Sequence, residues 1–246
     1  MPVTVNTIAL LNQFRRDQSA DAFATLTRRY VNLVFSVAHR RLNDPALAEA
    51  ATQTVFARLA GVPPLVTTES ELLGWFHQTA IDVTLNLRPS DSCRKDLEQI
   101  VATPNPGMAD RDPLWTEIAL YLDAAIENLT PTERQAVLMK FFEDKSHHDI
   151  GSKFGLGAGD NISKIHVGRA LERLRISFSS KGIVCTLGTL ATLLDDYAIE
   201  TAPGSLVTRL SRLPDLSGST PPGAADPTPS GWLPKIAALF RKGVGP

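Results

Sequence analysis

The sequence has few cysteines and no long apolar run. Cys93 and Cys185 stand far apart, outside any CxxC or Cys/His spacing, which argues against a disulfide scaffold and indicates a reducing compartment. A membrane-spanning helix needs about 20 residues, and the longest weakly polar stretch, 182–194, is shorter than that. Residues 1–9 lack the basic start and apolar run of a secretory signal. We therefore expect a cytoplasmic protein without stable membrane insertion.

Motifs for catalysis or ligand binding are also missing. No Ser/His/Asp or Cys/His set stands in a pattern that would activate a nucleophile, so we expect no catalytic residues. Gly155, Gly157 and Gly159 are spaced like a loose phosphate loop, but no strand precedes them and no Gly-Lys-Ser/Thr follows. His147 and His148 are adjacent, and adjacent side chains diverge on a helix, which disfavours metal binding. We expect no enzyme activity, cofactor, metal or small-molecule substrate.

The apolar residues that are present recur with helical spacing. They predict a helix over 19–42 and a third helix over 70–87. Between these, Asp44 and Pro45 open a second helix that runs to about Ala60, because Asp is a good N-cap and Pro needs no backbone donor. These three helices predict a first all-α domain.

A proline-rich segment then separates this domain from a second one. Acidic residues outnumber basic residues over 82–127, so the connection is an acidic linker. Thr130, Pro131 and Glu133 form a predicted capping box at the start of a further helix.

A helix-turn-helix unit is predicted beyond this capping box. Ser146 begins a short helix, with Gly155 as its left-handed stop, and a turn over 157–160 leads to a longer helix through Leu174. Basic residues outnumber acidic residues over 145–181, although the net charge of the chain is −1. A basic second helix can enter the DNA major groove. The alternative is that the basic face belongs to an ordinary amphipathic helix whose charged side chains only face solvent.

The chain ends with one more apolar helix over 182–202 and a segment over 214–231 that is rich in proline, glycine and serine. A short amphipathic helix is predicted over 232–242. We therefore expect an all-α fold of two small helical domains. The expected division is an N-terminal segment 1–18, a first helical domain 19–89, a linker 90–113, a helix-turn-helix domain 114–180, a helical extension 181–213 and a disordered tail 214–246.

Several short strings, in this order and spacing over 20–178, resemble the sigma-70 family, especially its extracytoplasmic-function branch. They are Asp21-Ala22-Phe23 with Tyr30, Ala48-Glu49 through Gln53-Thr54-Val55-Phe56, Gly74-Trp75-Phe76, Leu129-Thr130-Pro131-Thr132-Glu133-Arg134, His148-Asp149-Ile150-Gly151 and Arg169-Ala170-Leu171-Glu172-Arg173-Leu174-Arg175.

This resemblance implies a region 2 domain that binds core RNA polymerase and melts the minus-10 element, and a region 4 domain that reads the minus-35 element. The partners would be core RNA polymerase and promoter DNA, with an anti-sigma factor as a further partner if one exists. The resemblance assigns Glu49 and Gln53 to polymerase binding, Arg88, Arg94 and Lys95 to the minus-10 element, and Lys164, Ile165, His166, Arg169 and Arg173 to the minus-35 element. It assigns Phe56 and Trp75 to the core of region 2.

The sequence departs from the family pattern at several of these positions. Ala50 replaces an acidic residue, the basic end of region 2 is reduced, and Ile162 and Ile165 stand where polar or basic residues are usual. Isoleucine can contact a thymine methyl group but offers no hydrogen bond to a base. Two alternatives therefore stay open: a degenerate sigma-like protein that binds polymerase or a partner without opening promoters, and a helix-turn-helix regulator that acts without polymerase.

Overall fold

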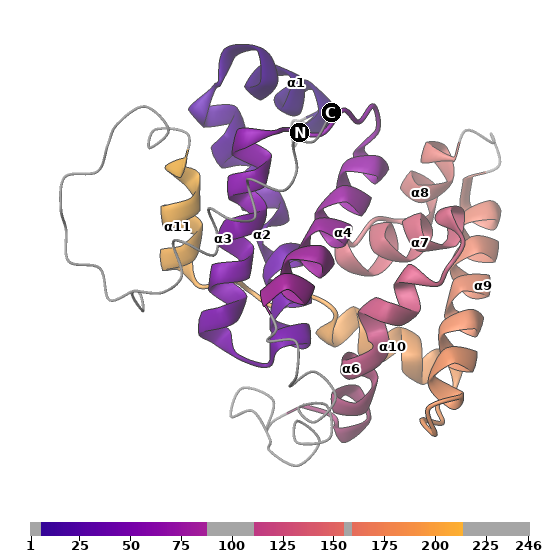
Figure 1. Cartoon of the computed structure of the whole chain (residues 1–246). Helices are drawn as coiled ribbons and strands as arrows, with labels where there is room; N and C mark the ends of the chain where they lie inside the picture. Colours follow the sequence, from indigo (N-terminus) through magenta and orange to yellow (C-terminus); the bar gives the residue numbers. More distant parts are fainter. Residues whose placement is uncertain (1–5, 88–110, 155–158, 214–246) are drawn as a thin grey trace, which may run out of the picture.

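All secondary structure is helical in residues 6–87, 111–154 and 159–213, which are the parts that the computed structural model describes (Figure 1). The predicted all-α fold class is therefore confirmed. No helix among these residues is both long and apolar enough to cross a membrane. The elements are α1 (Thr7–Asp17), α2 (Ala20–Leu42), α3 (Pro45–Gly61), α4 (Glu69–Leu87), α6 (Pro113–Glu127), α7 (Pro131–Val137), the π-helical turn η2 (Leu138–Phe142), α8 (His147–Lys153), α9 (Gly159–Ser179), α10 (Leu187–Tyr197) and α11 (Gly204–Ser211).

Some sequence predictions lie outside the described residues. These are most of the linker over 90–113, the stop at Gly155, the first half of the turn over 157–160, and the tail with its short helix over 232–242. The second half of that predicted turn, Gly159 and Asp160, already belongs to α9.

The first three helices begin at residues that can accept a hydrogen bond. Asn6, Ser19 and Asp44 each accept backbone N–H groups of the first turn, at 3.0–3.3 Å. Such caps satisfy donors that a helix cannot bond internally. The predicted starts of α2 and α3 are confirmed, whereas α1 was not predicted from the sequence.

Aromatic side chains fill the core of this first helical group. Phe56 and Phe76 are fully buried, with ring centroids 5.5 Å apart, and Tyr30 stacks on Phe76 at 4.5 Å. Trp75 is half-buried against the same core. The sequence-based assignment of Phe56 and Trp75 to the core is confirmed.

The second helical group, α6 to α9, begins at Asp112 and contains the predicted capping box. Pro131 occupies the first turn of α7, and the Glu133 carboxylate accepts the backbone N–H of Thr130 at 3.2 Å. Trp115 of α6 is fully buried. This group corresponds to the part of the sequence in which a helix-turn-helix was predicted.

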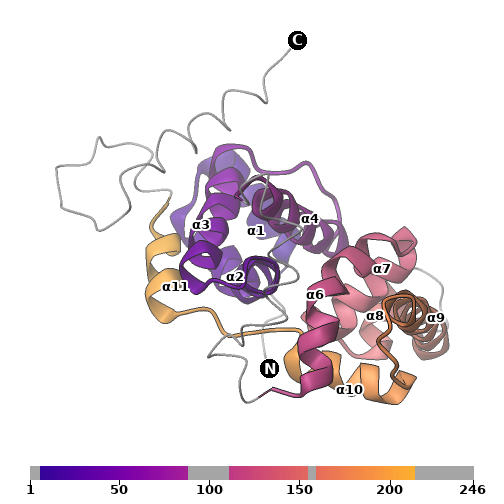
Figure 2. The same cartoon turned by 60° about the horizontal axis from the view of Figure 1, so that its bottom comes forward.

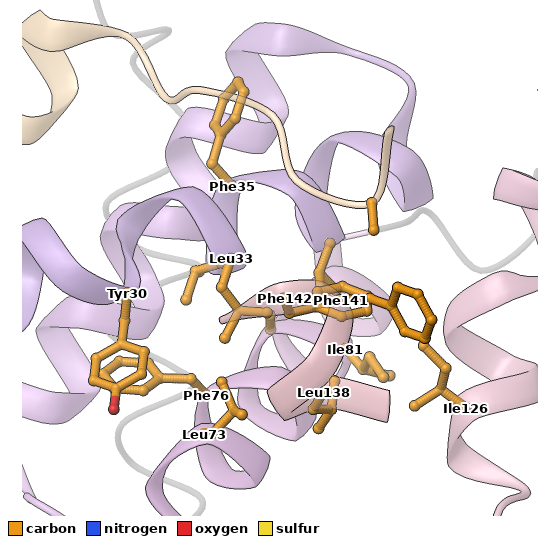
Figure 3. Close-up of a cluster of buried hydrophobic side chains, with 14 of the residues drawn as sticks. Tyr30, Leu33, Phe35, Leu73, Phe76, Ile81, Ile126, Leu138, Phe141 and Phe142 are labelled. Carbon is orange, nitrogen blue, oxygen red and sulfur yellow. The ribbon is translucent and has the colours of Figure 1, made fainter. Parts of the chain in front are cut away.

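The two helical groups share one hydrophobic core. Leu138, Phe141 and Phe142 from η2 are buried in a cluster with Leu33 of α2 and Ile81 of α4 (Figure 3). The contacts of α2 with α6, and of α4 with α7 and η2, continue this packing. Region 2 and region 4 candidates are therefore in direct contact in this structure.

A buried ion pair crosses the same interface. Arg40 of α2 donates to both carboxylate oxygens of Asp123 on α6, at 2.9 and 3.2 Å, and His77 of α4 lies 3.3 Å from Asp123. Burial alone would raise the pKa of Asp123, but the positive charge of Arg40 and the His77 hydrogen bond hold it well below its usual value. A buried carboxylate with two partners ties three helices together.

A second polar cluster joins the first group to α8. Lys153 donates to Glu69 at the start of α4 at 2.6 Å, and Arg29 of α2 also pairs with Glu69. The buried Glu143 carboxylate lies 3.5 Å from Arg29 and has no hydrogen-bond partner among the described residues. Burial, together with the charge of Glu69, raises the pKa of Glu143.

The C-terminal part turns back across the molecule. The helix predicted over 182–202 is present but shorter: Gly182 has φ 85°, α10 starts only after its cap Thr186, and the helix ends at Tyr197. α10 packs on α9, whereas α11 packs on α2 and α3 (Figure 2). We call residues 198–211, which cross α2 and end with α11, the C-terminal strap.

Candidate nucleic-acid interface and partner-binding face

The helix-turn-helix unit consists of α8 and α9. Ser146 caps α8 by accepting the Asp149 N–H at 3.1 Å, and Ile150 is fully buried. His147 Nδ1 lies 2.9 Å from the Oγ of the buried Ser163, which fixes α8 against the start of α9. Partial burial and the nearby lysines lower the pKa of His147, so the ring stays neutral near neutral pH.

One face of α9 presents the predicted minus-35 residues to solvent. Lys164 and Arg169 are exposed, and Ile165 is 50% exposed between them. No hydrogen bond to another described residue ties down Lys164 or Arg169, so both cations are available to a ligand. Lys164, Ile165 and Arg169 form what we call the exposed row of α9. The row combines positive charge with an apolar side chain near the helix N-terminus, where recognition helices contact base edges.

Other predicted contacts on α9 have structural partners. The His166 ring packs against Phe154, with centroids 5.5 Å apart, and is half-buried. Arg173 donates to the buried Glu133 carboxylate at 3.1 Å, and Glu133 in turn caps α7. These two residues hold α9 against α7 and α8, a role that spacing along α9 alone could not reveal.

Ile162, the other departure from the family pattern, is half-buried near the start of α9 and does not join the exposed row. Arg175 is paired with Glu172 at 2.6 Å on its own helix. The outward chemistry of α9 therefore centres on Lys164, Ile165 and Arg169.

The predicted polymerase-binding residues lie on α3 and face the C-terminal strap. Glu49 and Gln53 are half-buried, one helical turn apart. Arg209 of α11 donates to Glu49 Oε2 at 2.8 Å. With the Gln53 amide oxygen turned toward the guanidinium, it accepts from Arg209 at 2.7 and 3.3 Å. The structure thus brings both residues together, beneath a helix that the sequence did not predict.

The predicted minus-10 residues Arg88, Arg94 and Lys95 lie outside the described residues. Among the described residues no group of three or more His, Cys, Asp or Glu side chains could hold a metal ion.

The fold and its exposed basic row define a helical protein with a helix-turn-helix of the DNA-binding kind, and comparisons with known proteins find similar sequences among sigma factors. The family described as "Sigma-70, region 4" matches residues 119–174, from α6 into α9. The "ECF RNA polymerase sigma factor SigE" of Mycolicibacterium smegmatis is 28% identical over 162 residues. That match covers 62% of this chain and 61% of the relative, so the chain spans about three fifths of its length. No solved structure matches.

Together, these matches and the all-α fold support a sigma-70 factor of the extracytoplasmic-function type.

Proposed function

We propose that the chain is a sigma factor that binds core RNA polymerase and directs promoter-specific transcription initiation. Region 4, formed by α6 to α9, reads the minus-35 element. Region 2, formed by α2 to α4, binds polymerase through Glu49 and Gln53 and the minus-10 strand through the basic segment at 88–95. The observation that carries this proposal is the exposed row of α9 on a capped helix-turn-helix that matches sigma-70 region 4.

The three residues of that row supply different contacts. Lys164 offers a compact charge suited to phosphate, whereas Arg169 can also donate two parallel hydrogen bonds to the edge of guanine. Ile165 can contact a thymine methyl group. We infer a minus-35 element in which at least one thymine contacts Ile165.

Promoter binding requires region 2 and region 4 to separate. The minus-10 and minus-35 promoter elements are named for positions about 25 base pairs apart, which is about 85 Å of DNA at 3.4 Å per base pair. In this structure the regions share the core around Phe142 and the buried pair of Arg40 and Asp123. The arrangement described here is therefore that of the free protein, and polymerase binding opens it.

Reconstitution with core polymerase tests the proposal. The purified chain should associate with core polymerase and produce a run-off transcript from a mapped promoter, with promoter binding that weakens as salt rises. Glu49→Arg with Gln53→Ala should lower association with core polymerase. A chain that does not associate with core polymerase at all would exclude this function.

One observation favours the alternative that the chain is a degenerate sigma-like protein: the hydrophobic Ile165 stands at a position that faces solvent. A protein of that kind would bind core polymerase stably without opening any promoter. Robust specific transcription would exclude it. A free helix-turn-helix regulator would instead shift operator DNA without polymerase, which a gel-shift with the purified chain decides.

A further inference from the structure

The C-terminal strap lies directly over the face of α3 that carries Glu49 and Gln53. Arg209 bonds to Glu49, and to Gln53 as described above. In Figure 1, α11 lies against α3 on the side away from region 4. The side chains assigned to polymerase binding are therefore already engaged by another segment of the same chain.

Apolar burial holds α11 in place more firmly than this ion pair does. Leu206 and Leu210 are 0% exposed, one turn apart on the side of α11 that faces the helical body. By contrast, the Arg209 side chain is 52% exposed and its partner Glu49 29% exposed, and pairs of this kind contribute little. Arg209 thus gives α11 its position over Glu49, and the leucines give most of its attachment.

The segment before α11 is anchored to α2 through its backbone and one carboxylate. The backbone N–H of Glu200 donates to Ser36 Oγ at 2.6 Å, and the N–H of Ala202 donates to Asn32 at 3.0 Å. The Glu200 carboxylate lies 2.8 Å from His39 Nδ1 and accepts from Arg111 at 2.7 Å. These bonds hold the strap across α2 at a fixed register.

The other end of the strap continues from α10, which packs on α9 of region 4. Arg40, which pairs with Asp123 of region 4, also donates to the backbone carbonyl of Ala198. One continuous segment therefore joins region 4 to the far face of region 2.

We propose that the C-terminal strap is an intramolecular cover of the polymerase-binding face, which must leave α3 before core polymerase can bind there. This inference rests on the proposed function. The occupant of the face in the free chain is α11, and its competitor is core polymerase. Because only the uncovered fraction binds, the apparent dissociation constant is raised by the reciprocal of that fraction.

Binding to core polymerase by full-length variants tests the cover. Arg209→Glu places a carboxylate against Glu49 and should tighten binding to core polymerase about two- to fivefold. Leu210→Asp removes the main apolar attachment and should tighten it about tenfold or more. Arg212→Glu makes the same charge change at an exposed residue just after α11 and should leave binding unchanged. Equal affinity of all four proteins would overturn the inference.

A second measurement tests, in the absence of polymerase, whether α11 covers the face of α3. In a chain whose Cys93 and Cys185 are changed to serine, Gln53→Cys reports access to the face through its rate of reaction with a maleimide. Labelling should be slow, become several-fold faster with Arg209→Glu, and slow again when Glu49→Arg restores the ion pair with reversed charges. Labelling that is fast in all three would show that α11 does not cover α3.

The two measurements separate failure of the cover from failure of the function. Fast labelling throughout, with normal binding to core polymerase, overturns the cover alone. Slow labelling with no binding to core polymerase by any variant, Leu210→Asp included, overturns the proposed function and this inference with it.

Discussion

At the scale of single residues, the side chains of α9 divide into those that face solvent and those that hold the helix in place. We expect Lys164→Ala and Arg169→Ala each to weaken binding of the holoenzyme to minus-35 DNA by about 1–3 kcal/mol for a base contact. Fluorescence anisotropy at two salt concentrations measures this, because loss of a phosphate contact also lowers the salt dependence.

Arg175→Ala is the matched control for these variants. Its guanidinium is already paired with Glu172 on the same helix, so binding should change little. If Lys164→Ala and Arg169→Ala both bind like the unchanged protein, the DNA-reading face of α9 lies elsewhere.

The buried Asp123 carries a stability prediction. Asp123→Asn leaves Arg40 buried without a counter-charge, which should lower the free energy of unfolding by about 3–5 kcal/mol. Urea denaturation measures the change. Glu117→Gln, at an exposed position of the same helix, should have almost no effect.

At the scale of elements, α8 is short and depends on its cap. It has 7 residues, and Ser146 accepts the Asp149 N–H in its first turn. Ser146→Ala should lower the free energy of unfolding by about 1 kcal/mol and speed amide exchange in α8. Ser205→Ala, an exposed change in α11, serves as the control. An unchanged exchange rate in α8 would mean that packing on α9 alone orders this helix.

The elements that sequence reasoning found are those with local signals. The starts of α2, α3, α7 and α8 follow from caps, prolines and apolar spacing within a few residues. α11 has a short apolar stripe, Leu206 and Leu210, whose meaning depends on α2 and α3 far back in the sequence. Local patterns carry no information on such a partner, and for that reason α11 was not predicted.

At the scale of the whole molecule, the attachment of the strap should depend on pH. Burial would raise the pKa of Glu200, but its bonds to His39 and Arg111 lower it from 4.5 to about 2. A lowered pKa in the folded state means that the ionised carboxylate adds stability above the ordinary pKa and loses this contribution as pH falls from 4.5 toward 2.

Comparison with Glu200→Gln checks this pH dependence. The unchanged chain should be the more stable at about pH 6, and its advantage in free energy of unfolding should shrink by about pH 3. Urea denaturation at both pH values gives the difference. An advantage that is the same at both would mean that the charge of Glu200 does not hold the strap.

The candidate site was predictable only where its residues act through their own helix. The exposed positions of Lys164 and Arg169 follow from the periodicity of α9, and the family strings pointed to Glu49 and Gln53. The contact of Glu49 with Arg209, 160 positions further along the chain, has no local signature. The same holds for Arg40 and Asp123, which are 83 positions apart.

During synthesis, α3 leaves the ribosome before the C-terminal strap, so the strap cannot cover α3 at first. Glu49 emerges 160 residues ahead of Arg209, which at about 5–20 residues per second is roughly 8–32 s of synthesis. Throughout that interval the nascent chain presents Glu49 and Gln53 without their intramolecular occupant. If the proposed function holds, a polymerase that meets the growing chain competes with nothing, whereas one that meets the finished protein competes with α11.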